Sequence, residues 1–188
     1  MTVDTQIAEI LERKRADAWA DVIPPMFAEP LDWDTLDPTV TQWVRNPTGV
    51  LLLVGATGPG KTHAAFTVAH RLCVRQALPF RWWTAEGMLT ELAPGGDDRT
   101  DTAVTSTRLV LIDDLGAEPD TAWRTSTVGR IIDTRWANRL PTIITSNLTF
   151  AELAARYSTR VTSRINGEVT AVLFDGPDRR VLFGTHQV

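Results

Sequence analysis

Residues 50–62 read Val-Leu-Leu-Leu-Val-Gly-Ala-Thr-Gly-Pro-Gly-Lys-Thr, an apolar run that leads directly into a glycine-rich loop. Residues 55–62 match the pattern G-x-x-x-x-G-K-[ST], in which backbone N–H groups curl around a polyphosphate. Residues 63–72 then show a helical pattern, and the N-terminal end of such a helix attracts anions. A strand, this loop and a helix in succession predict a nucleotide-binding site. The alternative is a structural turn of similar sequence.

The loop itself consists of Gly55, Ala56, Thr57, Gly58, Pro59, Gly60, Lys61 and Thr62, and we expect all of them to contact the nucleotide. Lys61 would neutralise charge on the β- and γ-phosphates, and the Thr62 hydroxyl would ligate Mg²⁺. The motif does not by itself say what the bound nucleotide is used for.

A second signal lies at residues 109–116, Leu-Val-Leu-Ile-Asp-Asp-Leu-Gly, which read as a buried strand ending in two carboxylates. Asp113 could hold Mg²⁺ beside the phosphates, directly or through water, and Asp114 could orient or deprotonate the attacking water. The alternative is a solvated Asp-Asp turn, which is common after strands. Because a phosphate-binding loop lies upstream, we favour the catalytic interpretation.

A third signal lies at residues 142–147, Thr-Ile-Ile-Thr-Ser-Asn, another apolar strand that ends in polar residues. Asn147 could position the hydrolytic water or sense the γ-phosphate. Taken alone the signal is weak, because Ser and Asn also favour turns at strand ends. Its order behind the other two motifs favours the functional interpretation.

Two arginines near the end of the chain are the last candidates. Arg160 and Arg164 are four residues apart on one face of an expected helix, so one of them could reach the γ-phosphate of a neighbouring subunit. From spacing alone, a surface pair bonded to acids such as Glu152 or Glu168 is the favoured interpretation.

Short apolar segments alternate with helical patterns along most of the chain. We expect strands at 50–54, 80–84, 108–113 and 142–146, and helices at 6–20, 36–43, 61–76, 85–92, 122–139 and 149–156. Strands that are apolar on both faces and separated by helices predict an α/β fold with a parallel sheet and crossover connections. We further expect a loop at 94–99, a short helix at 158–166, and a terminal hairpin formed by 169–174 and 180–183.

The composition of the 188 residues is that of an ordinary globular domain, with 43% hydrophobic and 22% charged residues. The net charge of −4 argues against a protein that mainly coats nucleic acid, but it allows a local basic patch. No apolar run is long enough to cross a bilayer, and the N-terminus lacks the pattern of a secretion signal. We therefore expect a cytoplasmic protein that makes no membrane contact.

The aromatic residues and the single cysteine have a structural and a functional interpretation. Trp82 and Trp83 could stack on bases, but their place on an expected strand favours packing against helices. We expect the same of Trp123 and Trp136 on the long helix. Cys73 lies on the apolar face of a helix, which favours a buried structural thiol over a nucleophile.

Together these motifs resemble the ATPase domain of DnaC/IstB-type AAA+ proteins. The likeness rests on residues 23–27, 55–62, 109–116, 140–148 and 160–165, and it covers about residues 20–183. It implies a P-loop NTPase with an AAA+ core, a parallel five-stranded sheet of order 5-1-4-3-2, and ATP with Mg²⁺ bound between the subunits of a homo-oligomer. It also places Arg164 at the arginine-finger position, which reverses the interpretation from spacing, and makes Arg160 a supporting basic residue.

Members of that family load replicative DnaB-type helicases onto single-stranded DNA, or assist a transposase. The resemblance therefore implies ATP hydrolysis that controls assembly and DNA contact. The chain departs from the family pattern in that only residues 1–22, a helical segment that we expect to dock a partner, precede an ATPase domain at residues 23–188. Residues 93–107 are also short for the extra helix that grips single-stranded DNA, and we expect no C-terminal lid domain.

The main hypothesis is thus an ATP-driven helicase loader, and a transposase helper of the IstB type shares every motif with it. A P-loop small-molecule kinase is the alternative from another class. No arginine-rich lid segment is evident for it, and the pair Asp113 and Asp114 suits attack by water better. An ATP-binding module with negligible hydrolysis is a third reading. The roles of Arg179 and Arg180 stay open.

Overall fold

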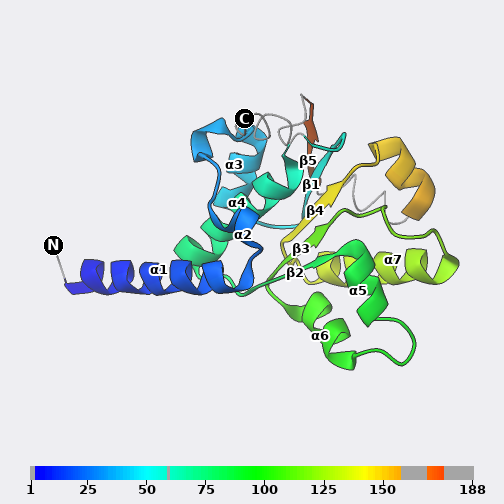
Figure 1. Ribbon diagram of the computed structural model, residues 1–188, viewed down its shortest axis with the longest axis horizontal. Coiled ribbons are helices and arrows are strands. Elements are labelled where there is room, and N and C mark those ends of the chain that lie inside the picture. The colour runs from blue at the N-terminus through cyan, green and yellow to red at the C-terminus, as the bar shows by residue number, and fades with distance from the viewer. Residues whose placement is uncertain (1–2, 59, 158–168, 176–188) are drawn as a thin grey trace, which may run out of the picture.

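The computed structural model describes residues 3–58, 60–157 and 169–175, which form a parallel sheet with helices on both faces (Figure 1). The strands are β1 (Val50–Gly55), β2 (Phe80–Thr84), β3 (Leu109–Asp113), β4 (Thr142–Ser146) and β5 (Val169–Phe174). Their order is β2-β3-β4-β1-β5, and each neighbouring pair is parallel. This is the predicted order 5-1-4-3-2 read from the other edge, so the prediction is confirmed. In the described part of the chain no separate lid domain accompanies the sheet.

The helices are α1 (Val3–Val22), α2 (Pro25–Ala28), α3 (Pro38–Arg45), α4 (Lys61–Gln76), α5 (Ala85–Glu91), α6 (Asp98–Ser106) and α7 (Ala122–Ala137), with a 3₁₀ turn, η1 (Trp33–Thr35). Residues 150–157 are also helical. One face of the sheet packs against α1, α3 and α4, and the other against α5, α6, α7 and the helix of residues 150–157. None of the described helices is long and apolar enough to cross a bilayer.

The apolar run of β1 explains this two-sided packing. Successive side chains of a strand point to opposite faces, so both faces of a covered strand must be apolar. Leu51 and Leu53 accordingly lie in the core with α4, while Leu52 and Val54 lie in the core with α7. All four are 0 or 1% exposed. Burial on both faces therefore holds β1 rigidly in the sheet, and with it the loop that follows.

The structure differs from the sequence-based expectation after α5. Residues 98–106 form α6, a helix that the sequence analysis did not predict. The loop expected at 94–99 is present over residues 94–97, and its last two residues begin the helix. The helix begins where the Asp97 carboxylate accepts a hydrogen bond from the Arg99 N–H at 2.9 Å. Few of its residues are apolar, and Val104 is the apolar side chain that α6 buries completely.

At the other edge of the sheet, β5 pairs with β1 in parallel, with Val50 opposite Val169. The second strand of the expected hairpin, residues 180–183, lies outside the described residues. The expected short helix at 158–166 lies outside them as well.

Candidate functional site

The carboxyl ends of β1, β4 and β3, which are neighbours in the sheet, open onto one cavity of about 730 Å³. In open parallel sheets this edge is the usual place for a ligand. The lining residues are Met26, Phe27, Leu31, Thr57, Gly58, Gly60, Lys61, Thr62, His63, Asp113, Asp114 and Asn147. The structure thus brings together polar groups from three motifs that lie far apart in the sequence.

The loop after β1 begins and ends on glycines whose conformations exclude a side chain. Gly55 has φ +143°, and a Cβ added there would lie 2.0 Å from the backbone oxygen of Phe174 in β5. Gly60, which precedes the first residue of α4, has φ +99°, in the left-handed region that favours glycine. Pro59 between them lies outside the described residues, whereas Ala56, Thr57 and Gly58 are described.

Lys61 is 5% exposed, and a buried ammonium is costly unless it is hydrogen-bonded. Its Nζ donates to the backbone oxygens of Gly55 at 2.8 Å and Ala56 at 2.6 Å, and to Asn147 Oδ1 at 2.9 Å. A phosphate oxygen entering the loop would replace one of these acceptors. The side chain is therefore held at the loop in a position from which it can exchange partners.

Thr62 and Asp113 lie side by side, as the sequence predicted for a metal site. The Thr62 hydroxyl donates to Asp113 Oδ1 at 2.9 Å, and the Thr145 hydroxyl donates to the same oxygen at 2.6 Å. Burial raises the pKa of Asp113, and these two hydrogen bonds partly offset the increase. A carboxylate and a hydroxyl suit Mg²⁺, which often takes one or two carboxylates together with substrate phosphates and water.

Asp114 lies beside Asp113 and lines the same cavity, but it is exposed. Its φ is +61°, an uncommon value for an aspartate, and its side chain is exposed. The Asp114 N–H donates to the Thr145 hydroxyl at 2.9 Å, and Asn147 Nδ2 donates to Asp114 Oδ1 at 2.6 Å. Asn147 therefore joins the lysine of the loop to the second carboxylate. A water held between Asp114 and a bound phosphate would meet a base at this point.

The comparison with known proteins agrees with this geometry. Residues 31–164 match the model of the family described as IstB-like ATP binding protein. The chain belongs to this IstB-like family. The resemblance to DnaC/IstB-type AAA+ ATPases that the motifs carry is thereby confirmed.

Individual relatives of this IstB-like chain agree with the family. It is 27% identical over 147 residues to the replicative helicase loader DnaI of Bacillus subtilis (strain 168). That match covers 69% of this chain and 47% of DnaI, so the chain spans about half the length of this curated relative. Among solved structures, the DnaC helicase loader superimposes with a TM-score of 0.64 at 25% identity, covering 77% of this chain and 93% of that one. DnaI superimposes with a TM-score of 0.70 at 22% identity, covering 85% and 95%.

The sequence analysis did not identify the apolar wall of the cavity at the carboxyl edge of the sheet. Phe27 stacks on Phe66 with ring centroids 4.8 Å apart, and its ring lies edge-on to His63. The Leu31 N–H donates to the Thr67 hydroxyl at 3.0 Å, which fixes this segment on α4. Together with Met26, these side chains offer a flat, apolar surface that suits a nucleobase. Residues 23–27 carried a family resemblance, but nothing in their pattern assigned them a role.

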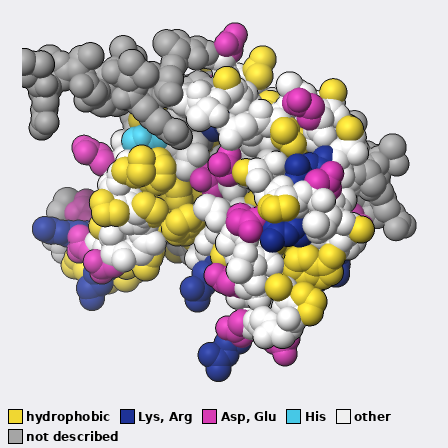
Figure 2. Space-filling model, turned by 45° about the vertical axis from the view of Figure 1, so that its right-hand side comes forward, with side chains coloured by type: hydrophobic (Ala, Val, Ile, Leu, Met, Phe, Trp, Pro, Cys, Tyr) yellow, Lys and Arg dark blue, Asp and Glu magenta, His cyan; other side chains and the backbone are white. Residues whose placement is uncertain are grey.

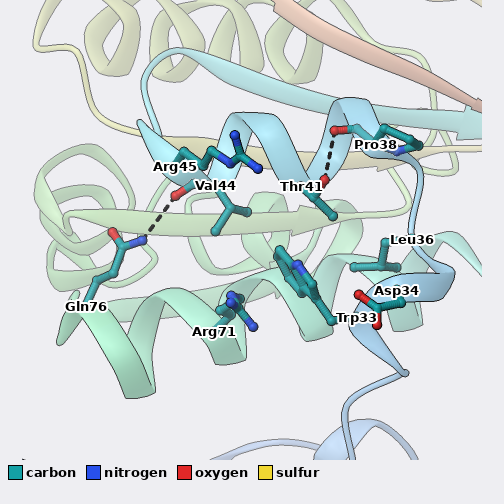
Figure 3. A pocket seen from close by; sticks show the side chains of 9 residues that line it. All are labelled: Trp33, Asp34, Leu36, Pro38, Thr41, Val44, Arg45, Arg71 and Gln76. Carbon is teal, nitrogen blue, oxygen red and sulfur yellow. Dashed lines mark hydrogen bonds between the residues drawn. The ribbon is translucent and has the colours of Figure 1, made fainter.

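A second hollow, of about 470 Å³, lies between α3 and α4 (Figure 3). Some of its polar side chains are engaged within the chain. The Arg71 guanidinium lies 4.1 Å from the centroid of the Trp33 ring, and Gln76 Nε2 donates to the Val44 oxygen at 3.1 Å. These contacts hold η1 and the chain before α3 against α4, so they also fix the apolar wall of the nucleotide cavity.

The remaining sequence-based expectations have mixed outcomes. Trp82 and Trp83 are partly buried and pack against the two cores, as predicted. Trp136 is partly buried, but Trp123 stays 36% exposed, so packing accounts for only part of its surface. Cys73 is partly buried, and burial raises the pKa of its thiol to about 12, as expected for a structural cysteine. Arg160, Arg164, Arg179 and Arg180 lie outside the described residues.

Proposed function

We propose that this chain binds and hydrolyses ATP with Mg²⁺ in the cavity at the carboxyl edge of the sheet, and that it uses this cycle to load a replicative DnaB-type helicase onto single-stranded DNA. The observation that carries the ATPase part is the hydrogen-bond chain Lys61–Asn147–Asp114, which lines the cavity beside Thr62 and Asp113. Membership of an ATP-binding family supports it independently.

In this proposal each side chain has one task. Lys61 and the N–H groups of the loop bind the phosphates, and Thr62 with Asp113 holds Mg²⁺. When bound, Mg²⁺ neutralises charge that develops on the phosphate oxygens. Asp114 orients the attacking water and accepts its proton. Asn147 contacts both Lys61 and Asp114, so a change at the phosphate reaches the base through a single side chain.

The proposal further includes a homo-oligomer whose sites are shared. Arg164 of one copy would reach the γ-phosphate held by a second copy and stabilise charge in the transition state, with Arg160 in support. This step rests on the resemblance of residues 160–165 to the family pattern. A cytoplasmic location is part of the same proposal.

For the helicase, we propose α1 as the docking element. Figure 1 shows α1 projecting from the body of the molecule. Its second half is anchored, because Trp19 is 4% exposed and Arg15 Nε donates to the Val74 oxygen at 2.7 Å. Its first half exposes Ile7, Ile10 and Leu11, which are 51, 56 and 47% exposed and lie at the spacing of one helix face. Such a stripe suits a hydrophobic groove on a partner.

The last part of the proposal is contact with single-stranded DNA. On the face drawn in Figure 2, lysine and arginine side chains are scattered among acidic and hydrophobic ones over the described residues. Base contacts would come from the segments 94–102 and 116–121, and part of the first belongs to α6. We therefore propose a DNA contact of limited extent that forms in the assembled oligomer.

The test is a pull-down of purified DnaB-type helicase by the full chain, with and without a non-hydrolysable ATP analogue. We expect nucleotide-dependent capture that Ile10→Asp abolishes and that Val22→Asp leaves intact, because Val22 is exposed on the same helix but lies about three turns beyond the stripe. If neither the wild type nor the control variant captures the helicase, the loader role is refuted.

A transposase helper of the IstB type is the second candidate, because the matching family carries the IstB-like description. The same pull-down with an IS21-type transposase in place of the helicase separates the two roles. Capture of the transposase alone would replace the loader by the helper. The family match gives no support to the small-molecule kinase.

A further inference from the structure

Glu118 is a buried carboxylate that the proposed mechanism does not use. It lies in the loop between β3 and α7, is 3% exposed, and does not line the nucleotide cavity. A buried charge of this kind is costly unless it is paired and hydrogen-bonded. Its partners therefore show what its burial achieves.

The polar contacts of Glu118 within the described residues join its own loop to a second segment. Glu118 Oε2 accepts a hydrogen bond from the Gly116 N–H at 2.9 Å, within its own loop. Glu118 Oε1 accepts from the Tyr157 hydroxyl and lies 3.2 Å from Arg156 Nη2, and the Glu118 backbone oxygen also accepts from Arg156. Tyr157 is 1% exposed, so this end of the helix of residues 150–157 is locked onto the loop.

The same loop begins at Asp114. The Ala117 N–H donates to the backbone oxygen of Asp114 at 3.1 Å, and the Leu115 N–H donates to the backbone oxygen of Thr145 at 2.9 Å. Gly116 has φ +98°, and a Cβ there would lie 2.4 Å from Leu148 Cδ1. Residues 114–118 thus form a tight turn that is fastened to β4 at its start and to the helix of residues 150–157 at its end.

Asp114 depends on such fastening. A left-handed backbone at a residue other than glycine is unfavourable and persists only where the surroundings enforce it. Its side chain is exposed, and the described structure gives it one hydrogen bond, from Asn147. The direction of its carboxylate is therefore set largely by the backbone of the turn.

We propose that Glu118 is a positioning residue for ATP hydrolysis: by joining Gly116 to Arg156 and Tyr157, it holds the turn that aims Asp114 into the cavity. This inference rests on the proposed role of Asp114 as the group that orients and deprotonates water. Glu118 acts only through Asp114, since it lies behind the turn and away from the cavity.

The test measures ATP affinity, the turnover number and the melting temperature of Glu118→Gln in the full chain. Glutamine keeps the shape and an acceptor for Gly116 but removes the charge opposite Arg156. We expect the turnover number to fall about 10- to 100-fold, as for a displaced catalytic group, while ATP affinity stays within about twofold. Glu152→Gln is the matched control, because Glu152 is exposed and caps the start of the same helix at Thr149.

A double-mutant cycle separates positioning from general structural damage. In an Asp114→Asn background, Glu118→Gln should cause no further loss of turnover, because the group that it aims is already inactive. Tyr157→Phe, which keeps both charges, covers the case in which Glu118→Gln does not fold, and it should lower turnover by a smaller factor without changing ATP affinity.

The outcomes distinguish the two proposals. If Asp114→Asn impairs turnover but Glu118→Gln and Tyr157→Phe match the wild type, the positioning role is overturned and the proposed function stands. An additive loss in the double mutant overturns it as well. If Asp114→Asn leaves turnover unchanged, both proposals fail.

Discussion

Two polar clusters lie at opposite ends of the same pair of strands, β3 and β4. The amino-edge cluster consists of Arg135 of α7 and the oxygens that it contacts, on Val104, Thr107, Arg108, Pro141 and Thr142. The carboxyl-edge cluster consists of Lys61, Asp113, Asp114, Thr145 and Asn147. Both bury charge in a sheet that is otherwise apolar, and the second opens onto the cavity described above.

The amino-edge cluster is closed. Arg135 is 1% exposed, and each of its five N–H groups has an oxygen within 3.5 Å, all from its own chain. Burial lowers the pKa of Arg135 to about 10, still well above neutral pH, so the guanidinium stays charged. Its hydrogen bonds join α7 to the end of α6 and to the starts of β3 and β4.

The carboxyl-edge cluster is open. Lys61 is nearly as buried, but its acceptors line the cavity and can be exchanged for a phosphate, and Asp114 is exposed. The comparison teaches that burial of a charge does not by itself mark a functional site. What indicates a functional site is a buried charge whose hydrogen-bond partners line a cavity that a ligand can enter.

The largest effect that we expect separates the clusters by stability. Arg135→Met should lower the free energy of unfolding by about 3–5 kcal/mol, because five backbone and hydroxyl oxygens lose their donors inside the protein. Urea unfolding measures the loss. Arg130→Met is the control on the same helix, because Arg130 forms a surface ion pair with Asp101, and it should change stability by less than about 1 kcal/mol. Equal losses for the two variants would contradict a structural role specific to Arg135.

The second prediction concerns the open cluster. Lys61→Ala should weaken ATP binding by about 10- to 150-fold, which corresponds to the loss of charged hydrogen bonds worth about 1.5–3 kcal/mol. Its effect on the free energy of unfolding should be small, because lost hydrogen bonds are offset by removal of a buried charge. Titration of a fluorescent ATP analogue gives the affinity. Lys14→Ala is the control with the chain's other lysine, and an equal loss of affinity there would remove Lys61 from the site.

The smallest effect concerns Asp113. Burial raises its pKa above the unfolded value, so the folded chain holds this proton more tightly than the unfolded chain does. The protonated Asp113 side chain therefore stabilises the fold below its pKa in the unfolded chain. This stabilisation is lost as the pH rises from that value through the higher pKa of the folded chain. Asp113→Asn lacks this loss and should melt slightly higher than the wild type at neutral pH, with a difference that shrinks toward acid pH.

Melting curves of both proteins across that pH range test the point, and Mg²⁺-dependent turnover of the variant should be lost. Asparagine can still accept from Thr62 and Thr145 through Oδ1, so the fold around it is preserved. If Asp113→Asn melts at a lower temperature than the wild type at neutral pH, the predicted direction of the change in stability is wrong.

The open cluster was largely predictable from the sequence, and the closed one was not. Lys61, Asp113 and Asn147 each follow an apolar strand, and the carboxyl ends of parallel strands meet at one edge, so their proximity followed from the order of the motifs. Arg135 lies within an amphipathic helix pattern, where a buried arginine has no local signature. Its acceptors come from two separate segments, residues 104–108 and 141–142, and only the tertiary fold brings them together.

Thr145 and Glu118, which lie next to the predicted site, also show which contacts a sequence pattern can reveal and which it cannot. Thr145 lies on β4, two residues before Asn147, which directly follows the strand, so the period of two was a signal that both face the same side. Glu118 had no such signal, because its partners Arg156 and Tyr157 are nearly forty residues away. The α6 helix was missed since its stability comes from the Asp97 cap and tertiary packing rather than from an apolar stripe.

The most direct test of the central claim is ATP turnover by Asp114→Asn, measured by phosphate release alongside ATP affinity. Loss of a positioned base should lower the turnover number about 10²- to 10⁴-fold while ATP binds as in the wild type. Asp120→Asn, an exposed aspartate in the same loop, should match the wild type in both quantities. Wild-type turnover by Asp114→Asn would show that the cavity binds ATP without Asp114 acting on water, and it would contradict the account.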